Sequence, residues 1–69
     1  MEKLTLYVPQ ISCQHCINNI KRELMGLSGV LEVFGDVGEK RIVVTFDSPA
    51  NVSRIKSLLE EIGYPGSEV

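Results

Sequence analysis

The chain has 69 residues, of which 43% are hydrophobic and 23% charged, with nine acidic and seven basic side chains. This length suits one small domain, expected to span residues 1–69, and the composition is typical of a globular chain and not of a disordered one. The net charge of −2, without a basic cluster, argues against nucleic-acid binding. No run of about 18 apolar residues is present, so we expect no direct insertion into a membrane.

Two changes of hydrophobic period define the first half of the chain. Apolar and polar side chains alternate over residues 4–8, which predicts a strand that Pro9 ends. Apolar residues then recur at helical spacing, and this pattern predicts a helix capped near its start by Ser12 and stopped at Gly29. A second apolar run over residues 30–34 predicts another strand.

The second half repeats this alternation of element types. After a hairpin turn rich in glycine and aspartate, a third strand is expected at residues 42–46. An amphipathic helix over residues 52–62 follows, with Asn51 or Ser53 as its cap and Gly63 as its end. The remaining residues leave room only for a short fourth strand.

The order β-α-β-β-α-β predicts a ferredoxin-like sandwich of the α+β class. Right-handed crossovers in its two halves place both helices on one face of a four-stranded antiparallel sheet. Met25 lies too far along the first helix to reach the first turn and is expected to fill the core. The predicted core comprises Leu4, Leu6, Val8, Ile17, Ile20, Leu24, Val30, Val33, Ile42, Val44, Phe46, Ile55, Leu58 and Ile62.

The only two cysteines, Cys13 and Cys16, are three positions apart in "ISCQHC". The predicted layout puts Cys13 in the loop after the first strand and Cys16 in the first turn of the first helix. Helix N-termini favour anions and lower thiol pKa values, so thiolate should be available near neutral pH. Thiolate is also the form that binds metal.

Several uses of this thiol pair can be compared. Two sulfurs cannot complete the four-ligand shell of structural zinc, and calcium or magnesium would need clustered oxygens. Two soft thiolates suit a soft ion of low coordination number, above all copper(I). A redox dithiol and an inert structural pair are the alternatives, although the motif lacks the usual preceding aromatic residue of the redox type.

Four segments resemble the heavy-metal-associated domain family: "ISCQHC" at 11–16, "GV" at 29–30, "VVTFD" at 43–47 and "GY" at 63–64. The resemblance covers nearly the whole chain and is greatest to free-standing bacterial copper chaperones. It implies that Cys13 and Cys16 bind copper(I) nearly linearly. It also implies transfer of the ion to the metal-binding domain of a copper-transporting P-type ATPase, without catalysis.

The chain departs from the family pattern just before the cysteines. Ile11 stands where the family usually has methionine, and it is expected to support the loop from the core. Zinc-preferring relatives often have an acidic residue at the position of Ser12, so this serine favours copper over zinc. Mercury, silver, cadmium or zinc are expected to bind in vitro.

Two further side chains are candidates for a role beside the sulfurs. His15 is either a solvated loop residue or a group that tunes the thiolates or ligates transiently. Tyr64 is placed beside the thiol loop by the fold, and the resemblance implies that its hydroxyl shields or hydrogen-bonds a sulfur; an aromatic at the core edge is the alternative. Lys21 and Arg22 are expected on the exposed side of the first helix, where they could steer docking to an acidic partner.

The predicted function is therefore that of a metal carrier. The N-terminus lacks the pattern of a signal peptide, so a cytoplasmic location is expected, where thiols stay reduced. Rival interpretations are a metal-binding domain of a mercury, zinc or cadmium transport system, a small thiol oxidoreductase, and an RNA-binding module of the same element order. The apo chain is expected to be a monomer, and a metal-bridged homodimer is left open.

Overall fold

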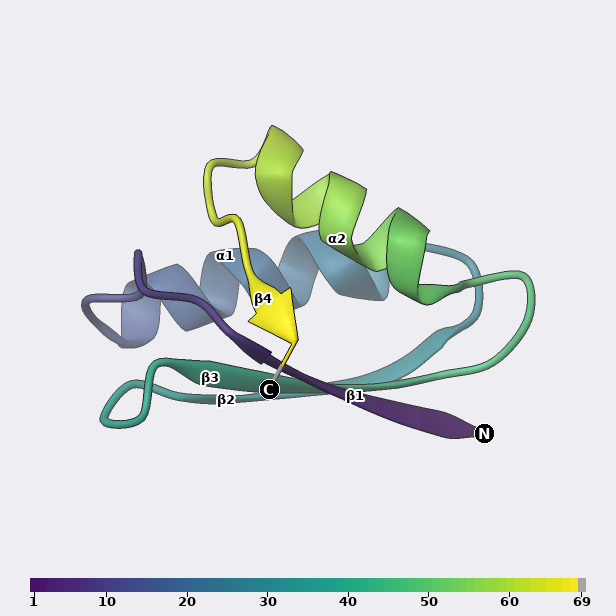
Figure 1. Ribbon diagram of the computed structural model, residues 1–69, viewed down its shortest axis with the longest axis horizontal. Helices are drawn as coiled ribbons and strands as arrows, with labels where there is room; N and C mark the ends of the chain where they lie inside the picture. The colour runs from purple at the N-terminus through teal and green to yellow at the C-terminus, as the bar shows by residue number, and fades with distance from the viewer. Residues whose placement is uncertain (69) are drawn as a thin grey trace.

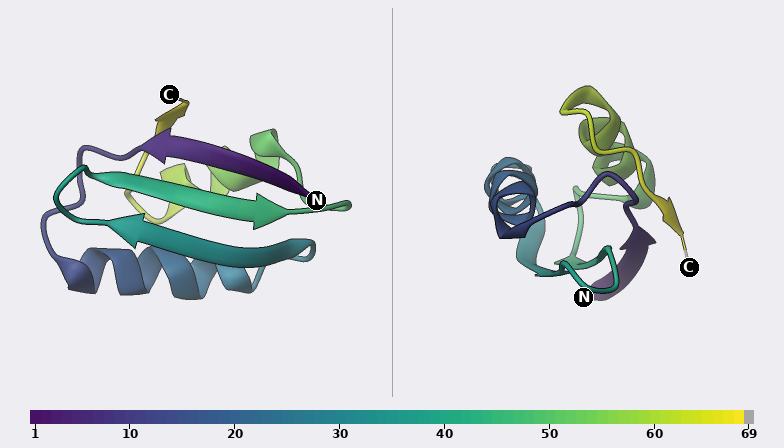
Figure 2. Two further views of the ribbon diagram at one scale, coloured as in Figure 1. Left: turned by 90° about the horizontal axis from the view of Figure 1, so that it is seen from below. Right: turned by 90° about the vertical axis from the view of Figure 1, so that its left-hand side faces the viewer.

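The computed structural model describes residues 1–68 and shows a four-stranded antiparallel sheet with both helices packed on one face (Figures 1 and 2). The strand order is β2-β3-β1-β4, as the predicted ferredoxin-like sandwich requires. No helix within these residues is long and apolar enough to cross a bilayer. The elements in chain order are β1 (Glu2–Tyr7), α1 (Gln14–Met25), β2 (Val30–Asp36), β3 (Arg41–Phe46), α2 (Val52–Glu61) and β4 (Ser67–Glu68).

The central strands β1 and β3 hold the sheet together. Leu4 pairs with Val44 and Leu6 with Ile42, so the apolar side chains of both strands point to the helical face together. Beyond the last residue of β1, the Val8 N–H still donates to the Lys40 carbonyl at 2.7 Å. This bond extends the ladder to the loop that leads into α1, so the start of that loop is fixed by the sheet.

The two helices begin and end differently from one another. The Asn51 side chain accepts from the Arg54 N–H at 2.9 Å, so Asn51 is the cap of α2, and the alternative candidate Ser53 lies within the helix. The predicted boundaries of α1 were wrong at both ends. Cys13 and not Ser12 occupies its N-cap position, and α1 ends at Met25 with Gly26 as its C-cap.

Gly29 lies beyond the end of α1, where its φ of 99° turns the chain into β2. A side chain there would collide with the Asp47 carbonyl and with Ala50, because the Gly29 carbonyl accepts from the Asp47 N–H at 2.8 Å. The glycine therefore marks a close approach of two backbones and not a helix cap.

The core lies between the sheet and the two helices. In α2 it centres on Ile55 and Leu59, while Leu58 and Ile62 are only half-buried, because residues four apart share one face. Met25 was wrongly expected in the core and is 46% exposed. The buried side chains are Leu4, Leu6, Val8, Ile11, Ile17, Ile20, Leu24, Val30, Val33, Ile42, Val44, Phe46, Ala50, Ile55 and Leu59.

Candidate metal site

The two cysteines flank the start of α1, at the end of the molecule where β1 passes into the helix (Figure 1). Cys13 is the N-cap residue, with extended backbone angles of −162° and 171° and no capping hydrogen bond from its side chain. Its side chain is exposed, whereas that of Cys16, in the first turn, is partly buried against the core. The Cys16 N–H donates to the Cys13 carbonyl at 3.1 Å, which closes the turn between them.

Both thiols are free, and their Sγ atoms are 4.0 Å apart. This separation is about twice the length of a disulfide bond. Beneath the loop, Ile11 is fully buried, and its N–H donates to the Val8 carbonyl at 3.1 Å. The loop is therefore supported from the core by an apolar side chain, while Cys13 is exposed and Cys16 is partly buried.

Hydrogen-bond donors surround the sulfur of Cys16. The Tyr64 hydroxyl contributes most, followed by the backbone and the hydroxyl of Ser12 and the backbone of Cys13, and together they lower the pKa of the Cys16 thiol to about 6 despite partial desolvation. The Ser12 Oγ lies 3.7 Å from the Cys16 Sγ. Ser12 therefore serves the sulfur and does not cap the helix. At neutral pH Cys16 is a thiolate, the nucleophilic and metal-binding form.

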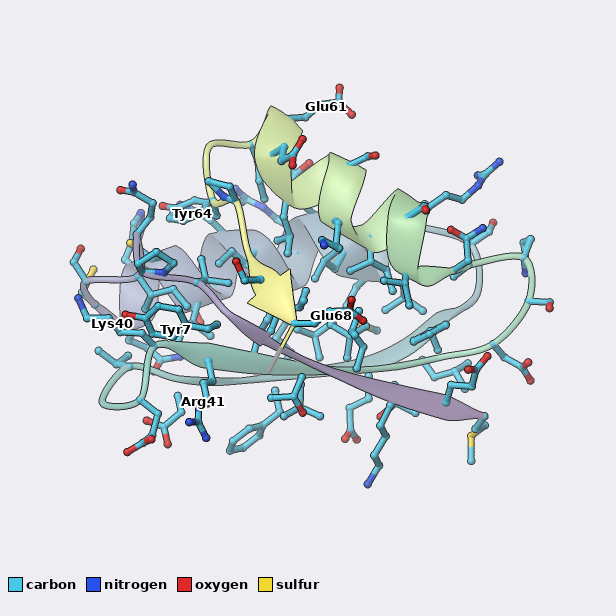
Figure 3. The ribbon with its side chains drawn as sticks, in the orientation of Figure 1. Tyr7, Lys40, Arg41, Glu61, Tyr64 and Glu68 are labelled. Carbon is cyan, nitrogen blue, oxygen red and sulfur yellow. The ribbon has the colours of Figure 1, made fainter. Side chains whose placement is uncertain are left out.

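Tyr64 follows the end of α2 and returns to the first turns of α1, as Figure 3 shows. The Tyr64 N–H donates to the Leu59 carbonyl at 2.8 Å, which fixes the backbone after the helix. The hydrogen bond to Cys16, with desolvation, raises the pKa of Tyr64, so the hydroxyl keeps its proton. The half-buried ring also packs against the core.

Other predicted residues lie farther from the sulfurs. His15 is exposed in the first turn of α1, and it is not among the groups that perturb the pKa of Cys16 within the described residues. Lys21 and Arg22 are exposed on α1, as predicted. Tyr7 is 40% exposed at the end of β1 (Figure 3) and, because it alternates with buried Leu6, lies on the face of the sheet opposite the core.

Asn19 is the side chain at this site that the sequence analysis missed. Its side chain partly opposes the rise in the pKa of Tyr64 through a hydrogen bond, and its Oδ1 accepts from Arg22 Nη2 at 3.3 Å. Its position three residues after Cys16, on the same face of a predicted helix, was the one available signal. That signal was insufficient, because only the path of the chain after α2 reveals Tyr64 as its partner.

The described part of the chain brings no group of three or more His, Cys, Asp or Glu side chains together. Within residues 1–68 the arrangement thus offers two sulfurs as soft ligands and leaves the rest of a coordination sphere open. Thiolates of this kind select soft ions over oxygen-preferring ones such as calcium or magnesium.

The family model of the heavy-metal-associated domain matches residues 5–65. A COP-associated protein of Helicobacter pylori is 38% identical over 61 residues, which cover 88% of this chain and 92% of that one. The copper chaperone CopZ of Bacillus subtilis is 34% identical over 65 residues, covering 93% and 94%. The periplasmic component of mercuric transport from Salmonella typhi is 33% identical over 67 residues, covering 96% and 74%.

Solved structures agree with these sequence matches. A copper-binding domain from HMA7, a P-type ATPase, superimposes with a TM-score of 0.93 at 26% identity, over 100% of this chain and 95% of that one. A chain of the Atx1-Cu(I)-Ccc2a complex superimposes with a TM-score of 0.90 at 25% identity, over 100% of this chain and 96% of that one. From the family match and the relatives, the chain belongs to the heavy-metal-associated domain family.

Proposed function

We propose that this chain is a copper(I) carrier that holds the ion on Cys13 and Cys16 and passes it to the metal-binding domain of a P-type ATPase. One observation carries the proposal: two free sulfurs lie 4.0 Å apart on a loop that a buried Ile11 supports. With metal–sulfur bonds of about 2.3 Å, the length found in zinc sites, two sulfurs on one ion lie about 4.6 Å apart when the ion is linear and closer together when it is bent. The loop would need little rearrangement to accept the ion.

The donor set favours copper(I) among the soft ions. Two thiolates without a third His, Cys, Asp or Glu in the described residues suit an ion that accepts two ligands, whereas zinc prefers four. Ser12 provides a hydroxyl in place of an acidic oxygen before the first cysteine. Mercury, silver, cadmium and zinc are the competing ions, and the mercuric transport relatives make mercury the first alternative to test.

The relatives support the proposed cargo and the proposed partner. One of them is named a COP-associated protein and another the copper chaperone CopZ. A P-type ATPase domain described as copper-binding has the same fold as this chain, and two chains are joined with Cu(I) in the Atx1-Cu(I)-Ccc2a complex. We extend both features to this chain, with an ATPase domain as the acceptor.

Transfer would proceed by ligand exchange at an open ion. A thiolate of the acceptor adds to copper(I) held by both sulfurs, giving a three-coordinate ion, and one original sulfur then leaves. Exposed Cys13 gives the acceptor access, while the donors around Cys16 stabilise the negative charge that its sulfur carries after release. The ion is never free in solution, and the charge on copper does not change.

Anaerobic mixing tests this proposal. The copper(I)-loaded chain is combined with an apo heavy-metal-associated domain of a copper-transporting P-type ATPase, and the metal on each is measured with time. Transfer to the acceptor domain should be much faster than loss of copper to buffer or to a dilute chelator. In Cys13→Ser, the rate of transfer should no longer exceed the rate of that loss. Transfer no faster than spontaneous dissociation would refute ligand exchange, and retention of mercury but not copper would favour the mercuric alternative.

The same proposal covers three wider properties. The chain acts as a binding protein without a reaction of its own, so reduction of insulin disulfides at a significant rate would contradict it. We place it in the cytoplasm, where two unpaired thiols 4.0 Å apart remain reduced. The apo chain is proposed to be a monomer, and size-exclusion chromatography of the loaded chain would show whether copper joins two copies.

A further inference from the structure

Gly35 lies near the end of β2, on the side of the sheet that the helices cover. It pairs with buried Ile42 of β3 and follows buried Val33 by two residues, so a side chain at this position would point toward the helices. Its backbone does not require a glycine, because Gly29 and Gly63 are the only glycines with a positive φ in the part of the chain that the structure describes. A glycine inside a strand weakens the strand and often marks the close approach of another segment.

The space in which that side chain would lie is occupied by Ile17 of α1, which packs against β2 (Figure 2). A Cβ atom on Gly35 would be 2.5 Å from Ile17 Cγ2, 2.9 Å from Cδ1 and 3.0 Å from Cγ1. Ile17 is buried, and a β-branched side chain in a helix has one strongly preferred rotamer, so it cannot swing aside. A methyl group at position 35 would therefore push the start of α1 away from the sheet.

The start of α1 also carries the thiol pair. Cys16 directly precedes Ile17 and is partly buried against the core, whereas Cys13 is the exposed N-cap residue. The Cys16 N–H donates to the Cys13 carbonyl at 3.1 Å, which ties the two residues into one turn. The depth at which Ile17 sits over Gly35 therefore sets how far Cys16 is shielded from solvent.

We propose that Gly35 is a positioning residue for the thiol pair: without a side chain there, Ile17 can seat the first turn of α1 on β2 and keep Cys16 partly buried beside exposed Cys13. The consequence for the metal ion rests on the proposed function. An ion on this pair would be shielded on the side of Cys16 and open on the side of Cys13, where an acceptor can reach it. The seating itself requires no metal.

Alkylation of Cys16 in the metal-free chain tests this seating. The rate with iodoacetamide is measured in a Cys13→Ser background at about pH 10, where thiols are ionised in every variant, so that it reports access to the sulfur. Gly35→Ala should raise this rate roughly threefold or more. Gly38→Ala is the matched control and should leave the rate unchanged, because a Cβ atom there would meet Asp36 Oδ1 at an ordinary contact distance of 3.4 Å.

Two further variants separate seating from loss of stability. Ile17→Ala removes the atoms that the new methyl group would meet, so adding Gly35→Ala in that background should change the rate by less than about twofold. Ile55→Ala removes a fully buried side chain of α2 and lowers stability without adding a group beneath α1, so it should not reproduce the increase.

Three results would overturn the assignment. They are equal rates in Gly35→Ala and Gly38→Ala, an undiminished effect of Gly35→Ala in the Ile17→Ala background, and the same increase in Ile55→Ala. If Gly35→Ala does not fold, as judged by circular dichroism, the Gly35→Ala/Ile17→Ala variant should fold, because the clash is then relieved. Failure of both variants to fold would also overturn the assignment.

Copper(I) loss distinguishes failure of this inference from failure of the proposed function. In the loaded chain with both cysteines, Gly35→Ala should speed loss of copper to bathocuproine disulfonate, and Gly38→Ala should not. An increased alkylation rate in a chain that holds no copper would retain the positioning role and reject only the carrier function. An unchanged alkylation rate would refute the positioning role whatever metal the chain carries.

Discussion

Tyr64→Phe tests the electrostatics of the thiol pair most sharply. The Tyr64 hydroxyl is the largest of the four hydrogen-bond contributions that lower the pKa of Cys16 to about 6. A thiol with this pKa is about half ionised at pH 6, against less than about 1% for an ordinary cysteine with a pKa near 8.5. Removal of the largest donor should raise the pKa of Cys16 and reduce its thiolate fraction at pH 6 roughly threefold or more.

The assay is alkylation by iodoacetamide as a function of pH in a Cys13→Ser background, which leaves Cys16 as the one thiol. The rate follows the thiolate fraction, so the Tyr64→Phe profile should move to higher pH. Tyr7→Phe is the control, because Tyr7 alternates with buried Leu6 in β1 and lies on the face of the sheet opposite the core. Coincident profiles for Tyr64→Phe and the parent would refute the assigned hydrogen bond, as would an equal displacement by Tyr7→Phe.

Three further predictions concern stability. Ile11→Ala should lower the free energy of unfolding, measured in urea, by about 2–4 kcal/mol, because Ile11 is fully buried. Met25→Ala should lower it by much less, because Met25 is largely exposed, and equal losses would contradict the assigned burial. Asn51→Ala should cost about 1 kcal/mol through loss of the α2 cap, seen as a lower urea midpoint, and an unchanged midpoint would reject the cap. Because the pKa of Cys16 is depressed in the folded chain, its contribution to stability is complete above the unfolded thiol pKa and is lost as pH falls through about 6. Cys16→Ser should therefore reduce the pH dependence of the free energy of unfolding. An identical pH dependence in this variant and the parent would contradict the depressed pKa.

The fold was predictable from the sequence because its signals are local and repeated. Alternation in β1 and β3 predicted the face that each strand buries, and the capping side chain of Asn51 was correctly anticipated. The errors came from tertiary effects. Gly29 resembles a helix stop but serves a close approach to Asp47, and Met25 has a core-like side chain at a helix position that faces solvent.

The thiol pair was visible in the sequence, but its surroundings were only partly so. Cys13 and Cys16 are three positions apart at the start of α1, so the local turn alone brings their sulfurs together. The contact that most lowers the pKa of Cys16 comes from Tyr64, about 50 residues later in the chain, and depends on how the chain after α2 returns to α1. Asn19 could not be assigned before that return was known, because a half-buried asparagine on a helix has many alternative partners.

The central claim is that Cys13 and Cys16 together hold one copper(I) ion. Anaerobic titration of the chain with copper(I) against bathocuproine disulfonate tests it directly. One ion should be retained per chain, and the Cys13→Ser/Cys16→Ser variant should retain none while keeping the fold, as judged by circular dichroism. Retention of copper by that double variant, or failure of the parent chain to compete with the chelator, would contradict the account.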